Sequence, residues 1–206
     1  MAHEQTRSEV RRERILESAL DVFSSRGYRD AAMDEIATES ETSKGGLYFH
    51  FPNKQTIFVA LLDRMAALLM TRAEAAIMAE SDPMGRIDVA LEVVLSTFGS
   101  HRRLTRLFLV DAVGAGRELN EKMLEIRREF SKMIARHLQD AVTSGAIPPI
   151  DANVAAMAWF GAINEVVLNW VLEDNPTPLE ESLPTLRVLL RRSVGATDTS
   201  GTGAEQ

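Results

Sequence analysis

Cysteine is absent from the 206-residue sequence, which excludes disulfide bonds and thiolate metal sites. The sequence also has no run of about 18 or more uncharged apolar residues, so no membrane-spanning helix is predicted. Residues 1–15 lack the apolar segment of a secretory signal peptide. We therefore expect a cytoplasmic protein that binds no membrane.

Motifs for catalysis are missing as well. The sequence contains no nucleophile–base spacing, HExxH helix, glycine-rich phosphate loop or paired-carboxylate motif. The histidines at positions 3, 50, 101 and 137 are too far apart for metal-ligand spacing. The sequence therefore predicts no enzymatic activity, no metal site and no cofactor.

Excess positive charge is the third absence. The formal net charge is −7, and residues 1–60 contain eight Lys or Arg against ten Asp or Glu. Total charge therefore does not predict binding of nucleic acid. The cations of this segment nevertheless cluster, at Arg7, Arg11, Arg12 and Arg14 and again at Lys44 and Lys54.

Helical periodicity, in contrast, runs along nearly the whole sequence. Apolar residues recur at three-to-four spacing, and turn signals come at long intervals. Asn53, Asp82 and Asp151 are suitable N-cap residues, and Pro184 is expected to interrupt the last helix near Leu183. We predict an all-α fold of nine helices, at 10–26, 31–39, 43–49, 53–79, 83–99, 102–113, 118–143, 152–172 and 179–194.

The third predicted helix lies in the sequence TSKGGLYFHF at positions 42–51. Ser43 at the N-cap can accept a hydrogen bond from the N–H of Gly45 or Gly46, and a first turn without side chains can approach a surface closely. Leu47 and Phe51 are predicted to point back to the preceding helices. Two interpretations fit: a helix-turn-helix that presents this N-terminus to DNA, or a helical hairpin whose glycines permit close packing.

Residues 11–62 resemble the TetR family of bacterial transcriptional repressors. The matching segments are RILESALDVFSSRGY at 14–28, DEIATES at 34–40, SKGGLYFHF at 43–51 and NKQTIF at 53–58. The predicted nine-helix layout is also that of the family. The resemblance implies a helix-turn-helix DNA-binding domain at 8–53 and a ligand-binding and dimerisation domain at 54–194. Residues 195–206 have the composition of a disordered tail.

The resemblance also implies which residues bind DNA. Lys54 is expected to contact a phosphate, so that Lys54→Ala lowers the salt dependence of binding by about one unit, and Arg7 is expected to belong to a mobile arm. Packing is an alternative role for Tyr48, and simple solvent exposure is one for His50. The predicted DNA-binding residues are Arg11, Arg12, Thr42, Ser43, Lys44, Gly45, Tyr48, His50 and Lys54.

Two positions depart from the family pattern. Glu41 stands where the family usually has glycine, so either Glu41 adopts a strained left-handed conformation, at a cost of about 1–2 kcal/mol, or the turn differs. Ala31 and Ala32 stand where the family usually has a threonine cap, and Asp30 is an alternative cap if the helix starts earlier.

A two-fold dimer follows if two such domains bind the half-sites of a palindromic operator. In the family the last two helices form the dimer interface. Small residues and leucines at three-to-four spacing fit this role here: Ala155, Ala158, Gly161, Ala162, Leu183, Leu186 and Leu190.

The resemblance implies a ligand pocket between the fourth and eighth helices. Most candidates are apolar, which favours a lipophilic effector, and for each of them a role in the core is the alternative. His137 and Asn164 are the most diagnostic, because a polar group on an apolar face needs a partner. The candidates are Phe58, Met65, Leu69, Phe98, Phe108, Phe130, Met133, His137, Trp159, Phe160 and Asn164.

The function expected from the sequence is a ligand-responsive transcriptional regulator. We expect a repressor that binds double-stranded DNA as a homodimer and is released when a lipophilic small molecule favours a second state. The alternatives are a helical adaptor that has lost DNA binding and an activator without ligand-induced release.

Overall fold

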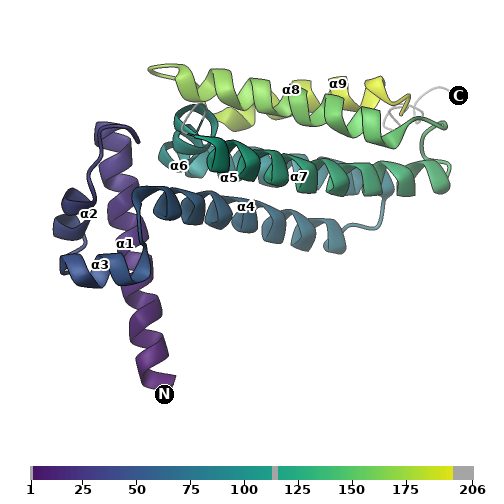
Figure 1. The fold of residues 1–206 in the computed structure, drawn as a ribbon. Helices are drawn as coiled ribbons and strands as arrows, with labels where there is room; N and C mark the ends of the chain where they lie inside the picture. Colours follow the sequence, from purple (N-terminus) through teal and green to yellow (C-terminus); the bar gives the residue numbers. More distant parts are fainter. Residues whose placement is uncertain (1, 113–115, 197–206) are drawn as a thin grey trace, which may run out of the picture. The chain divides into compact units, whose positions relative to one another are not determined.

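The computed structural model describes residues 2–112 and 116–196, and every regular element in these residues is helical. The predicted all-α fold with nine helices is confirmed for this part of the chain (Figure 1). The helices are α1 (Ala2–Arg26), α2 (Met33–Glu39), α3 (Lys44–His50), α4 (Lys54–Ala79), α5 (Pro83–Ser100), α6 (Arg102–Arg106), α7 (Arg117–Thr143), α8 (Ala152–Leu172) and α9 (Leu183–Ser193).

The predicted capping residues start their helices as expected. The Asp151 carboxylate accepts hydrogen bonds from the N–H groups of Asn153 and Val154 at the start of α8. Asp82 accepts from the N–H of Gly85 at 2.6 Å, and the Asn53 side chain accepts from the N–H of Thr56 at 2.9 Å. Each bond satisfies a donor that has no partner within the first turn of its helix.

Three elements differ from the prediction, and a fourth has the expected interruption. Helix α1 begins at Ala2, eight residues before the predicted start at position 10. The predicted sixth helix is α6 followed by a π-helix, η1 (Leu107–Asp111), and its predicted last residue, Val113, lies outside the described residues. A 3-10 helix, η2 (Leu179–Ser182), precedes α9, so Pro184 interrupts the chain where expected. Helix α2 starts at Met33 rather than earlier, so Asp30 does not cap it.

Contacts divide the chain into two compact units, one of residues 1–68 with 101–124 and one of residues 69–100 with 125–206. The first unit therefore contains the beginning of α4 and the segment around α6, beyond the predicted boundary at residue 53. Its core comprises Phe23, Ile36 and Leu47, each with no exposed side chain, and Phe51. Ile57 and Phe58 at the start of α4 complete this core, as predicted for three short helices.

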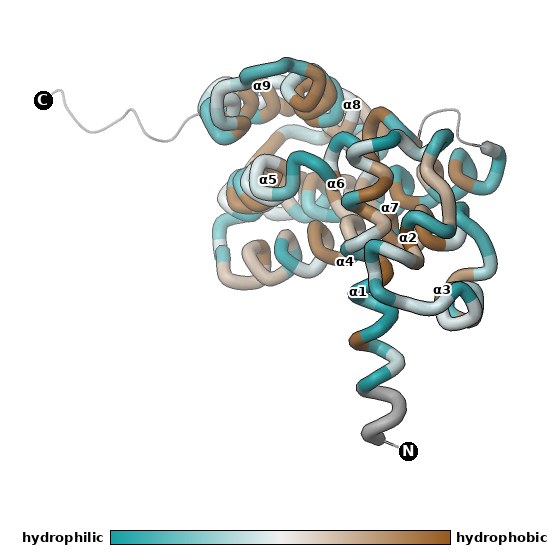
Figure 2. Tube along the Cα trace, turned by 90° about the vertical axis from the view of Figure 1, so that its left-hand side faces the viewer, coloured by the Kyte–Doolittle hydropathy of each residue, from teal (hydrophilic) through white to brown (hydrophobic). Residues whose placement is uncertain are grey.

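In the second unit, α5 packs against η2 and α9, and η2 also contacts α8. Arg191 on α9 pairs with Asp88 on α5 at 2.7 Å, and the indole N–H of Trp159 on α8 donates to the Ser193 hydroxyl at 2.9 Å. Figure 2 shows hydrophobic and hydrophilic positions alternating along α5, α8 and α9. Residues 197–206, most of the predicted tail, lie outside the described residues.

Helix α8 is long and apolar enough to cross a membrane by length and composition, the one such helix in the described part of the chain. Only 22% of its most apolar window is buried in the single chain. A single helix of this kind is weak support for a membrane span, because a helix at a protein interface has the same composition. The exposed apolar face of α8 therefore needs a partner, and the sequence predicts a second copy.

Candidate nucleic-acid interface

The turn between α2 and α3 closes with a non-glycine residue in the left-handed conformation. Glu41 has φ +48° and is the only described residue other than glycine with a positive φ. Its N–H donates to the Thr38 carbonyl at 3.1 Å, and the N–H of Thr42 donates to the Ala37 carbonyl at 2.9 Å. This is the Schellman pattern, in which glycine is usual at the position of Glu41. Of the two predicted alternatives, the left-handed conformation at Glu41 is therefore the one that the structure adopts.

Ser43 caps α3 as predicted. Its hydroxyl accepts a hydrogen bond from the N–H of Gly46 at 3.2 Å. A Cβ on Gly46 would lie 3.0 Å from the Thr42 methyl and 3.1 Å from the Ser43 hydroxyl, so internal packing accounts for this glycine. A Cβ on Gly45 would meet nothing within 4 Å. The fold therefore does not require glycine at position 45.

The exposed side of α3 consists of four residues at helical spacing: Lys44, Gly45, Tyr48 and Phe49. Tyr48 is 48% exposed and Phe49 is 83% exposed, whereas Leu47 on the opposite side is fully buried. Phe49 was not predicted as a site residue, although its position four residues after Gly45 was a signal. An exposed aromatic ring on a helix that enters the major groove can contact thymine methyl groups.

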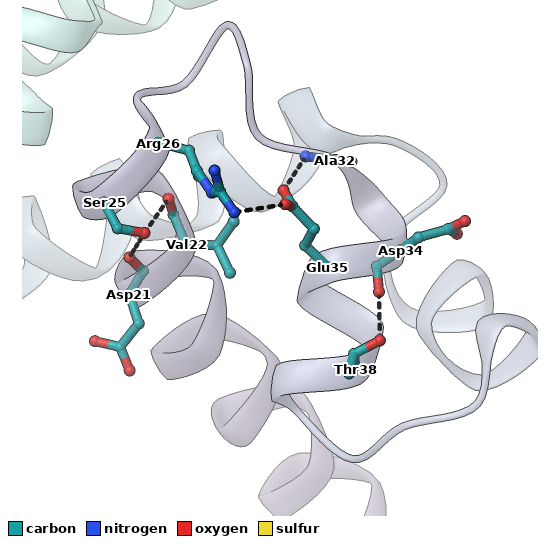
Figure 3. A network of polar contacts seen from close by, with 8 residues as sticks. All are labelled: Asp21, Val22, Ser25, Arg26, Ala32, Asp34, Glu35 and Thr38. Atoms are coloured by element: carbon teal, nitrogen blue, oxygen red, sulfur yellow. Dashed lines mark hydrogen bonds and ion pairs between the residues drawn. The ribbon is translucent and has the colours of Figure 1, made fainter.

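Two acidic residues of α2 pair with cations within the first unit. Asp34 pairs with Lys44 of α3 at 2.6 Å, and Glu35 pairs with Arg26 at 3.6 Å. Figure 3 shows that the Glu35 carboxylate also accepts a hydrogen bond from the N–H of Ala32 at 3.1 Å. This bond is the carboxylate half of a capping box, whereas the half that a threonine at position 32 would supply is missing. Asp34 and Glu35 also line an open groove of about 450 Å³ between α1 and α2. The carboxylates of Asp34 and Glu35 are therefore paired within the first unit.

Lys54 has a role that the sequence did not reveal. Its ammonium group donates to the carbonyls of Arg29 at 2.8 Å and Ala31 at 2.9 Å, and it lies 4.9 Å from the centre of the Tyr28 ring. Lys54 thus ties the start of α4 to the loop between α1 and α2. Its expected phosphate contact stays a prediction, but the side chain is already engaged by three groups of its own chain.

The predicted α1 contacts lie beside the end of α3. The guanidinium of Arg12 lies 5.2 Å from the centre of the Phe51 ring, and Phe51 is the C-cap of α3. Burial, together with the positive charges of Arg11 and Arg12, lowers the pKa of His50. The positive charges of both arginines make protonation of His50 less favourable, which adds to the effect of burial.

The predicted pocket residues separate into two groups. Phe58 packs against Phe23 and Tyr28, with ring centres 5.7 and 4.6 Å apart, which assigns it to the core of the DNA-binding unit. Met65 and Phe108 are buried in the same unit. In the second unit the structure buries Leu69, Phe98, Phe130, Met133 and Trp159 and leaves His137, Phe160 and Asn164 partly accessible.

His137 is the most unusual of these residues. Its side chain is only 15% exposed, and its nearest charged partner is Asp140, at 3.8 Å. The ring nitrogen Nδ1 is buried and has no hydrogen-bond partner in the described structure. Burial, followed by the charge of Arg136, lowers the pKa of His137. A neutral imidazole with a free polar atom is thus available to a polar group of a ligand.

The predicted dimer residues also fall into two groups, one accessible and one buried within the single chain. Ala158, Gly161 and Ala162 are exposed on α8 and Ala155 is partly exposed. On α9, Leu183 is partly exposed, but Leu186 and Leu190 are 4% and 5% exposed in the single chain, so their side chains already pack within it. Other exposed large apolar residues include Val154 and Met157 on α8, at 56% and 59%, and Leu189 on α9, at 60%.

Comparison with known proteins decides the family. The sequence model described as "Bacterial regulatory proteins, tetR family" matches residues 15–61, and "Tetracyclin repressor-like, C-terminal domain" matches residues 80–175. The HTH-type transcriptional regulator TtgR of Pseudomonas putida is 30% identical over 173 residues, which cover 78% of this chain and 80% of that protein. The chain belongs to the TetR family of transcriptional regulators. Homodimers and a cytoplasmic location are typical of this family.

Solved TetR-family structures have the same fold. FadR from Bacillus subtilis, solved in complex with stearoyl-CoA, has a TM-score of 0.80 at 22% identity, over 90% of this chain and 99% of that chain. AibR, solved with isovaleryl coenzyme A and operator DNA, has a TM-score of 0.70 at 19% identity, over 91% of this chain and 100% of that chain. At these identities the similarity concerns the fold. The similarity extends over nearly the whole length of both solved chains.

Proposed function

We propose that this TetR-family regulator is a homodimeric repressor, which binds a palindromic operator through α3 and leaves it when a lipophilic effector binds. The observation that carries the proposal is Gly45. Its α-carbon faces open space on the exposed side of α3, beside Tyr48 and Phe49. Nothing inside the chain requires a glycine there, whereas a surface that approaches the backbone closely would favour one, and DNA is the partner of this family.

The N-terminus of α3 suits an approaching phosphate. The Ser43 hydroxyl is already engaged by the N–H of Gly46, which leaves the N–H groups of Lys44 and Gly45 without a partner in their own helix. These groups and the positive end of the helix dipole favour an anion. Tyr48 and Phe49, one turn later, are then placed to read base edges. Thr42 lies just outside the helix, where it can contact the backbone of the duplex.

We propose that a second copy covers the exposed face of α8. Ala158 and Gly161 are small and exposed, so two α8 helices can approach closely, while Met157 and Leu189 supply apolar area. Association through this face removes the apolar surface from water. A two-fold dimer also brings two α3 helices to half-sites separated by about 34–36 Å or a multiple of this spacing.

The test of this interface is the oligomeric state in solution. Gly161→Arg places a charge on the face without a clash in the single chain, because a Cβ at this position meets nothing within 4 Å. We expect sedimentation to show a dimer for the natural protein and a monomer for the variant. Gln139→Arg, on an exposed position of α7, adds the same charge elsewhere and should remain dimeric. A dimeric Gly161→Arg variant contradicts the interface.

We propose an acyl thioester as the class of effector. The second unit contains buried apolar residues such as Phe130 and Met133, and the free Nδ1 of His137 lies among them as a possible partner for a carbonyl or thioester group. Solved proteins of the same fold bind stearoyl-CoA and isovaleryl coenzyme A. To release DNA, the ligand must bind the second state more tightly than the DNA-binding state, since equal affinity shifts nothing.

One experiment tests DNA binding and release together. Duplexes are selected from a randomised pool with the natural protein, and the recovered sequence is used in a gel shift with stearoyl-CoA, isovaleryl-CoA or free coenzyme A. We expect a palindromic sequence, a shifted band, and loss of the band with an acyl-CoA but not with coenzyme A. Failure to select any DNA at low salt would favour the adaptor. A band that persists with every acyl-CoA, with transcription raised in a reporter strain, would favour the activator.

A further inference from the structure

The cation at the N-terminus of α3 is held by a carboxylate of the preceding helix. The ammonium group of Lys44 lies 2.6 Å from Oδ2 of Asp34, which belongs to the first turn of α2. Both side chains are exposed, by 70% and 60%. Figure 3 shows the Asp34 carboxylate pointing away from that of Glu35, which pairs with Arg26. The two acids at the start of α2 therefore serve two different cations.

The fold itself gains little from this ion pair. An exposed pair stabilises a protein only slightly, because water and salt screen it. The favourable interaction of an acid with the positive end of α2 is available to Glu35 as well, whose carboxylate accepts from the N–H of Ala32. Lys44 and Asp34 belong to separate helices, so helical spacing does not produce the pair. Its main effect is therefore expected outside the folding of the chain.

The ion pair lies at the surface proposed to bind DNA. Lys44 is the first residue of α3, directly before Gly45, whose α-carbon faces open space. A lysine ammonium group has three donors, and Asp34 accepts from one of them. The remaining donors have no partner within the described residues, so an acceptor on DNA can bind Lys44 without displacing Asp34.

Pairing changes how Lys44 can contribute to DNA affinity. An unpaired lysine is a mobile point charge, which attracts any phosphate whatever the sequence. The carboxylate of Asp34 offsets this charge at close range and restricts the direction of the ammonium group. The hydrogen bond from Lys44 to Asp34, together with the charge of Asp34, raises the pKa of Lys44, so the paired group stays protonated. A paired Lys44 is therefore a weak attractor of phosphates but an oriented hydrogen-bond donor.

We propose that Asp34 is a specificity-determining residue for the operator, because it holds Lys44 as an oriented donor and offsets its charge. This inference rests on the proposed function. On the operator, the held ammonium group donates to an acceptor at a fixed place, such as O6 or N7 of a guanine. On other duplexes that acceptor is displaced, and the offset charge leaves little general attraction. Asp34 acts through Lys44 and is thus a positioning residue.

Simple competition between Asp34 and DNA predicts a different result. If Lys44 had to leave Asp34 in order to bind DNA, loss of Asp34 would strengthen operator binding by the full value of the broken pair. Scrambled DNA would gain no more than this, so the ratio of operator affinity to scrambled-duplex affinity would stay equal or rise. If Asp34 holds Lys44 on the operator, the ratio falls, because the variant gains general attraction and loses orientation. The direction of the change therefore separates the two mechanisms.

The first experiment compares Asp34→Asn with Glu39→Gln. Glu39 is the matched control, an exposed acid on the same helix with no ion pair among the described residues. Fluorescence anisotropy over a range of salt concentrations gives the affinities for the duplex selected by the natural protein and for a scrambled duplex. We expect Asp34→Asn to increase the salt slope on scrambled DNA by about 0.9, the value for one more phosphate. The affinity ratio should fall by about two- to fivefold, as for one exposed ion pair, and Glu39→Gln should leave it unchanged.

The second experiment repeats the substitution in a variant without the cation. In a Lys44→Met background, Asp34→Asn should leave the affinity ratio unchanged, because the two residues act as one unit. All variants should unfold near the temperature of the natural protein, since every substituted side chain is exposed. The inference is overturned if Asp34→Asn does not lower the ratio, or if it lowers the ratio equally without Lys44 or no more than Glu39→Gln does. If the natural protein selects no DNA at low salt, the proposed function fails instead.

Discussion

Gly45→Ala should make the protein more stable and a weaker DNA-binding protein at the same time. The stability gain follows from the structure, because the new methyl group meets nothing within 4 Å and alanine is favoured over glycine in a helix by at most about 1 kcal/mol. For a chain of this length that gain corresponds to a rise in unfolding temperature of about 2–4 °C. The first turn is more permissive than a helix interior, so the lower end is expected.

The loss of DNA affinity follows from the same methyl group. It would stand between the N–H groups of α3 and the phosphate that they bind in the complex. Loss of one hydrogen bond to a charged group costs about 1.5–3 kcal/mol, which corresponds to about 10- to 100-fold in the dissociation constant. Calorimetry gives the unfolding temperature, and anisotropy with the selected duplex gives the affinity.

Gly46→Ala is the matched control on the same turn. A Cβ there lies 3.0 Å from the Thr42 methyl and 3.1 Å from the hydroxyl of Ser43, which is the capping group. Disturbing the cap costs about 1 kcal/mol, which offsets the gain in helix propensity, so we expect no rise in unfolding temperature. If Gly45→Ala binds the duplex as tightly as the natural protein, close approach of DNA to Gly45 is refuted. If it lowers the unfolding temperature, the position is not open.

Three further predictions concern strain, a lysine and a histidine. Glu41→Gly should raise the free energy of unfolding by about 1 kcal/mol, because the strain of about 1–2 kcal/mol that is relieved at the positive φ exceeds the entropic cost of glycine. Chemical denaturation measures this free energy, and a lower value for the variant argues against strain at Glu41. Lys54→Met should lower the free energy of unfolding by about 1–3 kcal/mol, because two charge-assisted hydrogen bonds are lost. The slope of log K for DNA binding against log salt should change by less than about half a unit. A change of about one full unit in a stable variant would instead support a phosphate contact. Because the pKa of His137 is lowered in the folded state, the unfolded chain binds the proton more readily, and the free energy of unfolding should fall as pH drops below about 6.5. His137→Gln should flatten this pH dependence, measured by chemical denaturation at several pH values. Identical profiles for the two proteins would contradict the prediction.

Much of the local structure was predictable because short-range rules decide it. Ser43 and Asp151 cap their helices as expected, since the hydrogen bond of a cap involves only the next two or three residues. A left-handed Glu41 was one of two predicted alternatives, and the Schellman turn, which needs a left-handed residue whatever surrounds it, accounts for the one that the structure adopts. Burial of Leu47 and Phe51 followed from their spacing on α3.

Long-range contacts account for what the sequence did not reveal. The Lys54 ammonium group donates to the carbonyls of Arg29 and Ala31, more than 20 residues earlier, and the resemblance, which implied a phosphate contact, gave no indication of these bonds. Leu186 and Leu190 form a regular stripe, but a stripe does not specify whether it packs on its own chain or on a copy. The early start of α1 was missed because residues 2–9 have no apolar periodicity.

The division of the chain has a consequence for protein engineering. The unit that contains the DNA-binding helices also includes residues 101–124, and Arg103 from this segment pairs with Asp21 on α1 at 2.5 Å. The two family models, in contrast, match separate stretches, 15–61 and 80–175. A chimera joined between those stretches would give the DNA-binding helices a foreign α6. Transfer of this DNA specificity to another sensor therefore requires grafting the discontinuous segment together with the N-terminal one.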